Sequence, residues 1–390
     1  MPGTVLKTRS FHYRIFGTIP TLLKTTQLLY RSTSQTGTPT VNVTSVIQPP
    51  IQPDKTKVIS YQSAYDSLNQ NHEPSYAIWG GHTLGGVINN VEAVVFTPFL
   101  ADGYTIIVAD TEGQGADFGA GPEYGRNTLD SIRATFNSRE VDLPADAQVA
   151  MLGYSGGAIA TEWAAELAPT YAPDVNKRMI GAAIGGVLVH PAHNLHYVDG
   201  SVTWAGVMPM AIAGIGRAFR INFTPYLSDY GKKIFKNIEN ASIINVLGQY
   251  PGLTWKELAA PAYPTPDDIP VYVTVVNQLI MGTGDTPTIP LFIGQGANGV
   301  PEGTPNDKPD IGAGDGVMIA GDVRTLARKY CANGTTVYYE QYDDLTHASS
   351  LLPWLPSSIA WIMERFAGIP ARCNCSSIAR GNSLDPLPAP

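Results

Sequence analysis

The feature that most constrains this chain is a serine held between glycines, in the segment Gly-Tyr-Ser-Gly-Gly at residues 153–157. The apolar run AQVAMLGY precedes the serine, and GGAIATEWAAELAPTY follows it with apolar residues at helical spacing. This order predicts a buried strand, a sharp turn and a helix, with glycines where side chains would clash. An ordinary strand-to-helix turn is the simpler interpretation. The rest of the chain must therefore decide whether Ser155 is a nucleophile.

Strand and helix patterns alternate on both sides of this turn. YTIIVAD at 104–110 and AAIGGVLVH at 182–190 are short apolar runs typical of buried parallel strands. The alternation resumes after residue 287 with IPLFIGQG, VRTLARKYC, TTVYYEQY and SSIAWIMERFAG. These patterns predict an α/β-hydrolase fold, with a mostly parallel central sheet flanked by helices. The first hundred residues are expected to form strands and turns.

The pattern changes between His190 and Pro287, where helical segments predominate and Trp204–Phe219 is almost wholly apolar. We expect an inserted helical cap there, and the apolar stretch is either its core or the wall of an acyl-binding tunnel. We expect the hydrolase core to consist of two parts, residues 1–190 and residues 288–375, with the cap or lid at 191–287 inserted between them. Residues 376–390 are expected to form a loose, proline-rich tail.

A nucleophilic serine needs a general base and an acid that orients it, in the chain order serine, acid, histidine. His347 is the only histidine beyond the expected cap, and it lies on a loop before the last helix. The long loop between IPLFIGQG and the helix VRTLARKYC offers four acids: Glu302, Asp307, Asp310 and Asp315. Asp315, which lies nearest that helix, is the first choice for the orienting acid, and Asp310 is the second. Asp343 and Asp344 share the histidine's loop and are expected to face solvent.

The charge and the apolar content of the chain limit the kinds of partner and the compartment that we expect. The formal net charge is −8 with both signs interspersed, which argues against nucleic acid or an anionic membrane surface. No apolar run reaches the roughly 18 residues that a membrane-spanning helix needs. Residues 1–20 lack the apolar core of a signal peptide, so the chain is either a mature secreted form or an intracellular protein. The low charge and five glycosylation sequons favour secretion: Asn42, Asn222, Asn240, Asn333 and Asn374.

Several segments resemble the secretory lipase family, the fungal and bacterial lipases of the Candida antarctica lipase A type. They are PGTVLKTR, LLYRSTSQTGTP, SYAIWGGHT, VADTEG, GYSGGAIATEWAAELAPTYAP and RKYCANGTTVYYEQYDDLTH. The segments are spread over residues 2–347, and the resemblance extends over most of residues 2–375 and is weakest in the cap. The resemblance implies hydrolysis of carboxylic esters. The family's spacing between acid and histidine also leads from His347 back to Asp315.

The resemblance further implies that Asp110 joins the N–H of Gly156 in an oxyanion hole. A carboxyl donates a hydrogen bond only when protonated, so Asp110 would act through its backbone N–H or a raised pKa. The alternative is a turn residue at a strand end. The family pattern also implies a disulfide from Cys331 to the C-terminal segment, where Cys373 and Cys375 both fit. The long insertion before Asp315 departs from the family and is expected to reshape the mouth of the site.

The motif HPAHNLH places His190, His193 and His196 at a spacing that invites a metal interpretation. On a helix the first and third would point about 120° apart, and no carboxylate cluster accompanies them. Polar residues at the entrance of the cap are the favoured interpretation. We expect neither a metal nor an organic cofactor.

These observations predict a serine hydrolase acting on triacylglycerol or other acyl esters. Ser155 would attack the carbonyl carbon, His347 would take the proton and Asp315 would orient the imidazole. An acyltransferase or a narrow natural-product esterase could use the same residues, and a catalytically silent binding protein is the rival from another class. The expected partner is a small-molecule or lipid ester, met at a lipid–water interface in the lipase case. The oligomeric state stays open.

Overall fold

The structure is a computed structural model that describes residues 1–52 and 54–389. Within them, nine strands form one sheet in the order β1-β2-β3-β5-β4-β6-β7-β8-β9. Strands β1, β2, β3 and β5 pair antiparallel, and the pairs from β5 through β9 are parallel. The strands are Val5–Ile15 (β1), Ile19–Thr33 (β2), Pro39–Gln48 (β3), Lys57–Gln62 (β4), Thr105–Ala109 (β5), Gln148–Tyr154 (β6), Met179–Gly185 (β7), Leu291–Gly296 (β8) and Val337–Tyr342 (β9).

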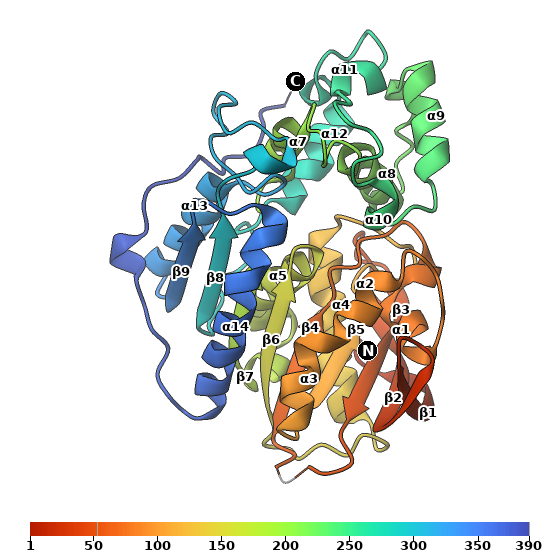
Figure 1. Ribbon diagram of the computed structural model, residues 1–390, viewed down its shortest axis with the longest axis vertical. Helices are drawn as coiled ribbons and strands as arrows, with labels where there is room; N and C mark the ends of the chain where they lie inside the picture. Colours follow the sequence, from red (N-terminus) through yellow and green to blue (C-terminus); the bar gives the residue numbers. More distant parts are fainter. Residues whose placement is uncertain (53, 390) are drawn as a thin grey trace.

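Helices cover both faces of this sheet, as predicted for an α/β chain (Figure 1). One apolar layer joins the sheet to α4 (Gly121–Asn137), α5 (Gly156–Tyr171) and α13 (Ala320–Ala332). The other joins it to α1 (Pro74–Trp79), α3 (Ala93–Ala101) and α14 (His347–Phe366). The strands that carry the serine turn are therefore buried on both sides, which explains their continuous apolar runs.

The expectation of strands and turns throughout the first hundred residues was wrong for residues 74–101. That segment forms α1, α2 (Val87–Val91) and α3. Pro74 occupies the first turn of α1, and Gly80 ends the helix in a left-handed conformation with φ 112°. The valines of this stretch suggest strand by propensity. Tertiary contacts override it, because Phe96 and Phe99 pack against the sheet from one helical face.

A group of helices lies above the carboxyl ends of the parallel strands (Figure 1). It has its own apolar core, to which α8 contributes Met208, Ile212 and Ile215. This segment occupies the place expected for the cap, and the domain boundaries drawn from the sequence stay a prediction. The helices are α7 (Pro191–Val198), α8 (Val207–Phe219), α9 (Asp229–Ile238), α10 (Ile243–Val246), α11 (Trp255–Leu258) and α12 (Pro270–Val276), while α6 (Pro173–Asn176) belongs to the core. Short 3-10 turns are Gln70–His72, Thr224–Tyr226, Pro266–Asp268, Asn277–Leu279, Val300–Glu302 and Cys375–Ser377.

The C-terminal tail is held against the protein rather than loose, contrary to the expectation from its composition. Asn382 donates to the carboxylate of Asp322 on α13 at 2.7 Å. Farther along, the amide of Asn277 donates to the carbonyl of Leu387 at 2.9 Å. A disulfide joins Cys331 to Cys375, and Cys373 is free and exposed.

The asparagines of the five sequons differ in their exposure to solvent. Asn42 is fully buried and donates to the carbonyl of Asp110 at 2.6 Å, so it offers no site for a glycan in the folded chain. Asn222, Asn240 and Asn333 are exposed, and Asn374 is half-buried. Among the described residues, no helix combines the length and the hydropathy needed to cross a membrane.

Candidate functional site

The serine turn has the geometry that its glycines predict. Strand β6 ends at Tyr154 and α5 begins at Gly156, with Ser155 between them at φ 56° and ψ −122°. This conformation is strained for a residue with a side chain. A Cβ on Gly157 would lie 2.0 Å from the carbonyl oxygen of Gln62. The glycines thus let the backbone of strand, turn and helix approach closely, and the hydroxyl stands at the helix N-terminus.

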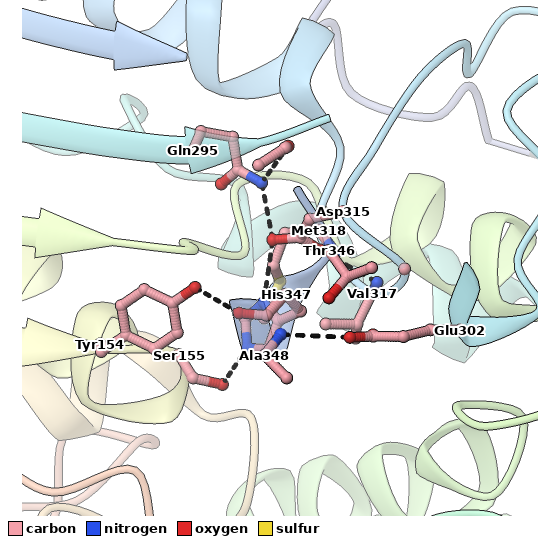
Figure 2. Close-up of polar contacts among 12 residues, drawn as sticks. Tyr154, Ser155, Gln295, Glu302, Asp315, Val317, Met318, Thr346, His347 and Ala348 are labelled. Atoms are coloured by element: carbon pink, nitrogen blue, oxygen red, sulfur yellow. Dashed lines mark hydrogen bonds and ion pairs between the residues drawn. The ribbon is translucent and has the colours of Figure 1, made fainter. Parts of the chain in front are cut away.

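Three side chains from distant parts of the chain meet above this turn (Figure 2). His347 Nε2 lies 2.8 Å from Ser155 Oγ, and His347 Nδ1 lies 2.8 Å from Asp315 Oδ2. With Nδ1 protonated, Nε2 is free to accept the hydroxyl proton. The three residues proposed from the sequence therefore form one continuous hydrogen-bonded chain.

Asp315 is fully buried and its carboxylate is held by three donors besides the histidine. Gln295 donates to Oδ2 at 2.8 Å. The N–H groups of Val317 and Met318 donate to Oδ1 at 3.1 Å and 2.7 Å. Asp310, the second choice from the sequence, lies exposed on the same loop. The structure thus brings Asp315 and not Asp310 to the histidine.

The imidazole of His347 is enclosed by aromatic rings as well as by Asp315. The hydroxyl of Tyr154 donates to the backbone carbonyl of His347 at 2.6 Å. The indole of Trp204 stands edge-on to the imidazole, with ring centroids 5.3 Å apart. Burial lowers the pKa of His347, but Asp315, Glu302 and Asp66 oppose it, and the net effect is a raised pKa.

Glu302 has a structural role at this site that its sequence position did not reveal. Its carboxylate accepts a hydrogen bond from Trp204 Nε1 at 2.6 Å. It also accepts one from the N–H of Ala348 at 3.2 Å (Figure 2). Ala348 lies in the first turn of α14, where a carboxylate is favoured by the helix dipole. Glu302 therefore ties the insertion before Asp315 to the cap and to the helix that carries the histidine.

The backbone N–H and the carboxylate of Asp110 both form hydrogen bonds away from the serine turn. Its backbone N–H donates to Val43 at 3.0 Å, within the sheet. Its carboxylate accepts from the N–H and the hydroxyl of Ser75 at 2.8 Å and 2.6 Å. Burial is the main cause that raises the pKa of Asp110 to about 6. The geometry thus contradicts the placement of Asp110 in an oxyanion hole and favours the strand-end alternative.

Asp66 occupies the place that Asp110 was expected to fill, and the sequence analysis missed it. A Cβ on Gly156 would lie 1.8 Å from Asp66 Oδ1, so this carboxyl is in contact with the backbone just after Ser155. Burial is the largest cause raising the pKa of Asp66 to about 7, while the nearby His347 lowers it. Asp66 follows β4, the strand beside β6, so its position after a buried strand was the available signal.

An apolar cavity lies between α5 and the cap helices α7, α8 and α12. Its wall includes Ile159, one helical turn after Ser155, and Phe118 from the loop after β5. Helix α8 supplies more of the wall through residues 207–215, which include Met208 and Ile212. The apolar stretch of the cap is thus both cap core and cavity wall.

The three histidines of the HPAHNLH motif have separate partners. His190 precedes α7 and its ring stacks on that of His193 at 3.7 Å. His193 contacts Asp322 at 3.0 Å, whereas His196 contacts Asp267 at 3.4 Å. Across residues 1–52 and 54–389, no group of three or more His, Cys, Asp or Glu side chains is arranged to hold a metal ion.

Comparison with known proteins identifies the family of this chain. The family model described as secretory lipase matches residues 81–305. Lipase 2 of Candida albicans is 31% identical over 92% of this chain and 75% of its own length. The chain belongs to the secretory lipase family. Its fold is that of an α/β-hydrolase, and by class it is a carboxylic ester hydrolase.

Two further relatives of this secretory lipase bear on its site. The crystal structure of Candida antarctica lipase A in its closed state superposes with a TM-score of 0.82 at 25% identity, covering 100% of this chain and 88% of that one. A probable inactive lipase of Mycobacterium tuberculosis is 29% identical over 95% of this chain and 80% of its own length. The family thus includes a member described as probably inactive, so activity has to be argued from the residues of this chain itself.

Proposed function

We propose that this secretory lipase hydrolyses acyl esters through Ser155, His347 and Asp315 and an acyl-enzyme intermediate. The observation that carries the proposal is the unbroken chain of contacts from Ser155 Oγ through His347 to Asp315, each 2.8 Å long. Two such contacts in the order nucleophile, base and orienting acid are the geometric signature of this chemistry.

The reaction proceeds in two halves. Ser155 Oγ forms a bond to the carbonyl carbon while its proton passes to His347 Nε2, and the carbonyl π electrons move onto oxygen. The C–O bond to the alcohol then breaks as His347 returns the proton to the leaving oxygen. Water gives a proton to the same nitrogen as its oxygen bonds to the acyl carbon. The bond from that carbon to Ser155 Oγ then breaks, His347 returns the proton to Oγ, and the acid leaves.

The N–H of Gly156 and the carboxyl of Asp66 are the groups we assign to the negative charge on the carbonyl oxygen. Gly156 is the first residue of α5, where the first N–H groups lack partners within the helix. Asp66 touches Gly156 and, with its pKa raised to about 7, is available as a neutral donor near neutral pH. Donors fixed in advance at that oxygen typically contribute the largest part of such catalysis.

The apolar cavity beside Ile159 supports an acyl chain as the part of the substrate that the cap covers. The same enclosure makes transfer of the acyl group to an alcohol the alternative outcome, because an apolar pocket disfavours water. The disulfide between Cys331 and Cys375 favours an oxidising compartment, so we extend the proposal to a secreted protein.

The test is hydrolysis of p-nitrophenyl esters of increasing acyl length by wild type and Ser155→Ala. We expect the variant to lose at least about 10⁴-fold in kcat, as removal of a nucleophile does. A variant with full activity would exclude Ser155. Added alcohol separates hydrolysis from transfer. If wild type is inactive on every ester and unlabelled by a fluorophosphonate probe, the silent binding protein is the better interpretation.

A further inference from the structure

The exposed apolar side chains of this protein are concentrated in two segments of the chain. Of seventeen large hydrophobic residues that are exposed among the described residues, nine lie in two short segments. The first is the β1–β2 hairpin and the second runs from the end of α1 into α3. The nine, which we name the docking face, are Leu6, Phe16, Ile19, Leu22, Trp79, Leu84, Val87, Val91 and Val94.

These two segments form one surface. Gly17, at the tip of the hairpin, lies against Gly80 and His82, which follow α1. The guanidinium of Arg9 on β1 stacks over the ring of Trp79 at 4.7 Å. The apolar tip of the hairpin is therefore continuous with the segment that leads into α2.

Helix α2 and the start of α3 carry apolar side chains on their outer side, although α3 also packs Phe96 and Phe99 inward. Val87, Val91 and Val94, at positions i, i+4 and i+7, are turned outward, and Val91 and Val94 are 56% and 68% exposed. Two polar side chains of this stretch are turned inward. Asn89 is buried and accepts from Ser63 at 2.6 Å, and Glu92 accepts from the N–H of Ala64 at 2.8 Å. A helix that presents its apolar face to the outside is suited to an apolar medium.

The charge of the hairpin half of the docking face is opposite to that of the whole chain, whereas the half from α1 to α3 carries no Lys or Arg. Residues 1–53 contain five Lys and Arg and neither Asp nor Glu, although the chain carries a net charge of −8. Lys7, Arg9, Arg14 and Lys24 are exposed on the hairpin beside its apolar residues. Apolar side chains bordered by cations match a lipid surface that carries negative charge.

We propose that the docking face binds an anionic lipid–water interface. This inference rests on the proposed function, since lipid docking serves an enzyme whose substrate lies in that phase. It also connects to the site: Ser63 and Ala64, which Asn89 and Glu92 hold, come directly before Tyr65 and Asp66. The net charge of −8 argues against such a surface for the chain as a whole, and the proposal rests instead on residues 1–53, which lack Asp and Glu.

The test is co-sedimentation of the Ser155→Ala protein with vesicles of phosphatidylcholine, with and without phosphatidylglycerol. The inactive protein keeps binding independent of hydrolysis, and soluble-ester activity of wild type tests the proposed function separately. We expect binding to the anionic vesicles that weakens with salt, and little binding to neutral ones. Adding Arg14→Glu should weaken binding to the anionic vesicles.

Val91→Asp and Val300→Asp form a matched pair, because the two valines are 56% and 58% exposed and Val300 lies outside the docking face. We expect Val91→Asp to need about tenfold more lipid for half-binding, and Val300→Asp to bind like its parent. If Val91→Asp has a lowered thermal midpoint, Val94→Asp is used in its place. Absence of vesicle binding, equal losses in the pair, or a dimer that Val91→Asp dissociates would overturn the proposal.

Discussion

At the scale of single residues, the two carboxyls that sequence analysis did not assign are the most informative. Asp66 touches the backbone after the serine, and Glu302 joins the histidine helix to the cap. Neither belongs to a motif. The role of each carboxyl follows from the groups that surround it. For each, a substitution that keeps the shape of the side chain but removes its charge gives a testable prediction.

Asp66→Ala is expected to lower kcat about 100-fold, because one donor to the developing oxyanion is lost. Asp66→Asn should retain more activity, since its amide donates at any pH. The carboxyl donates only when protonated, so wild-type kcat should fall as pH rises through about 7, and Asp66→Asn should lack this fall. The measurement is kcat against pH for the three proteins. If all three proteins show the same dependence of kcat on pH, the side chain of Asp66 does not donate a hydrogen bond to the oxyanion.

Glu302→Gln should move the acid limb of kcat/KM to lower pH. The charge of Glu302 favours the imidazolium, so its removal lowers the pKa of His347 and the free base persists to lower pH. Asp344→Asn is the matched control, because Asp344 is exposed on the loop that precedes the histidine. An unchanged limb in Glu302→Gln, or an equal shift in Asp344→Asn, would contradict the electrostatic role and leave Glu302 as a packing contact.

At the scale of elements, the unit of strand β6, serine turn and helix α5 depends on close backbone approach. The Cβ of an alanine at residue 157 would meet the carbonyl oxygen of Gln62 on β4 at 2.0 Å, and a carbonyl in a sheet cannot move aside freely. The helix would have to shift relative to the sheet, and with it the N–H groups that face the substrate.

Gly157→Ala is therefore expected to lower the free energy of unfolding by about 2 kcal/mol or more. The measurement is equilibrium unfolding in urea, followed by far-UV circular dichroism. Gly334→Ala provides the comparison: nothing lies within 4 Å of its Cβ position, so its loss comes from its φ of 95°, whereas Gly157 lies in α5 and has no positive φ. If Gly157→Ala is no less stable than Gly334→Ala, the contact with Gln62 does not have the expected cost.

At the scale of the whole molecule, the C-terminal segment links parts that are far apart in the sequence. The disulfide joins the end of α13 to the residues after α14, closing a loop with a sequence separation of 44. The tail beyond it contacts Asp322 on α13 and Asn277 in the cap region. The last residues of the chain thus hold the cap region and the core together.

Cys331→Ser should lower the free energy of unfolding by up to about 4 kcal/mol, the value that chain entropy gives for a loop of this length. Cys373→Ser should have almost no effect, because Cys373 is exposed and unpaired in the structure. Denaturant unfolding without reductant compares the two. Equal midpoints for both variants would mean that the tail is held by its other contacts alone.

The sequence by itself determined the serine turn, the strands beside it, and the assignment of His347 and Asp315 as candidates. These depend on local patterns, in which glycines, apolar periodicity and chain order suffice. Only the tertiary structure decided between Asp110 and Asp66. Both carboxyls follow buried strands, and strand order in the sheet places β4 beside β6 while β5 is one strand farther away. The exposed valines of α2 and α3 could not be foreseen either, since they suggest strand until the packing of Phe96 and Phe99 against the sheet turns them outward.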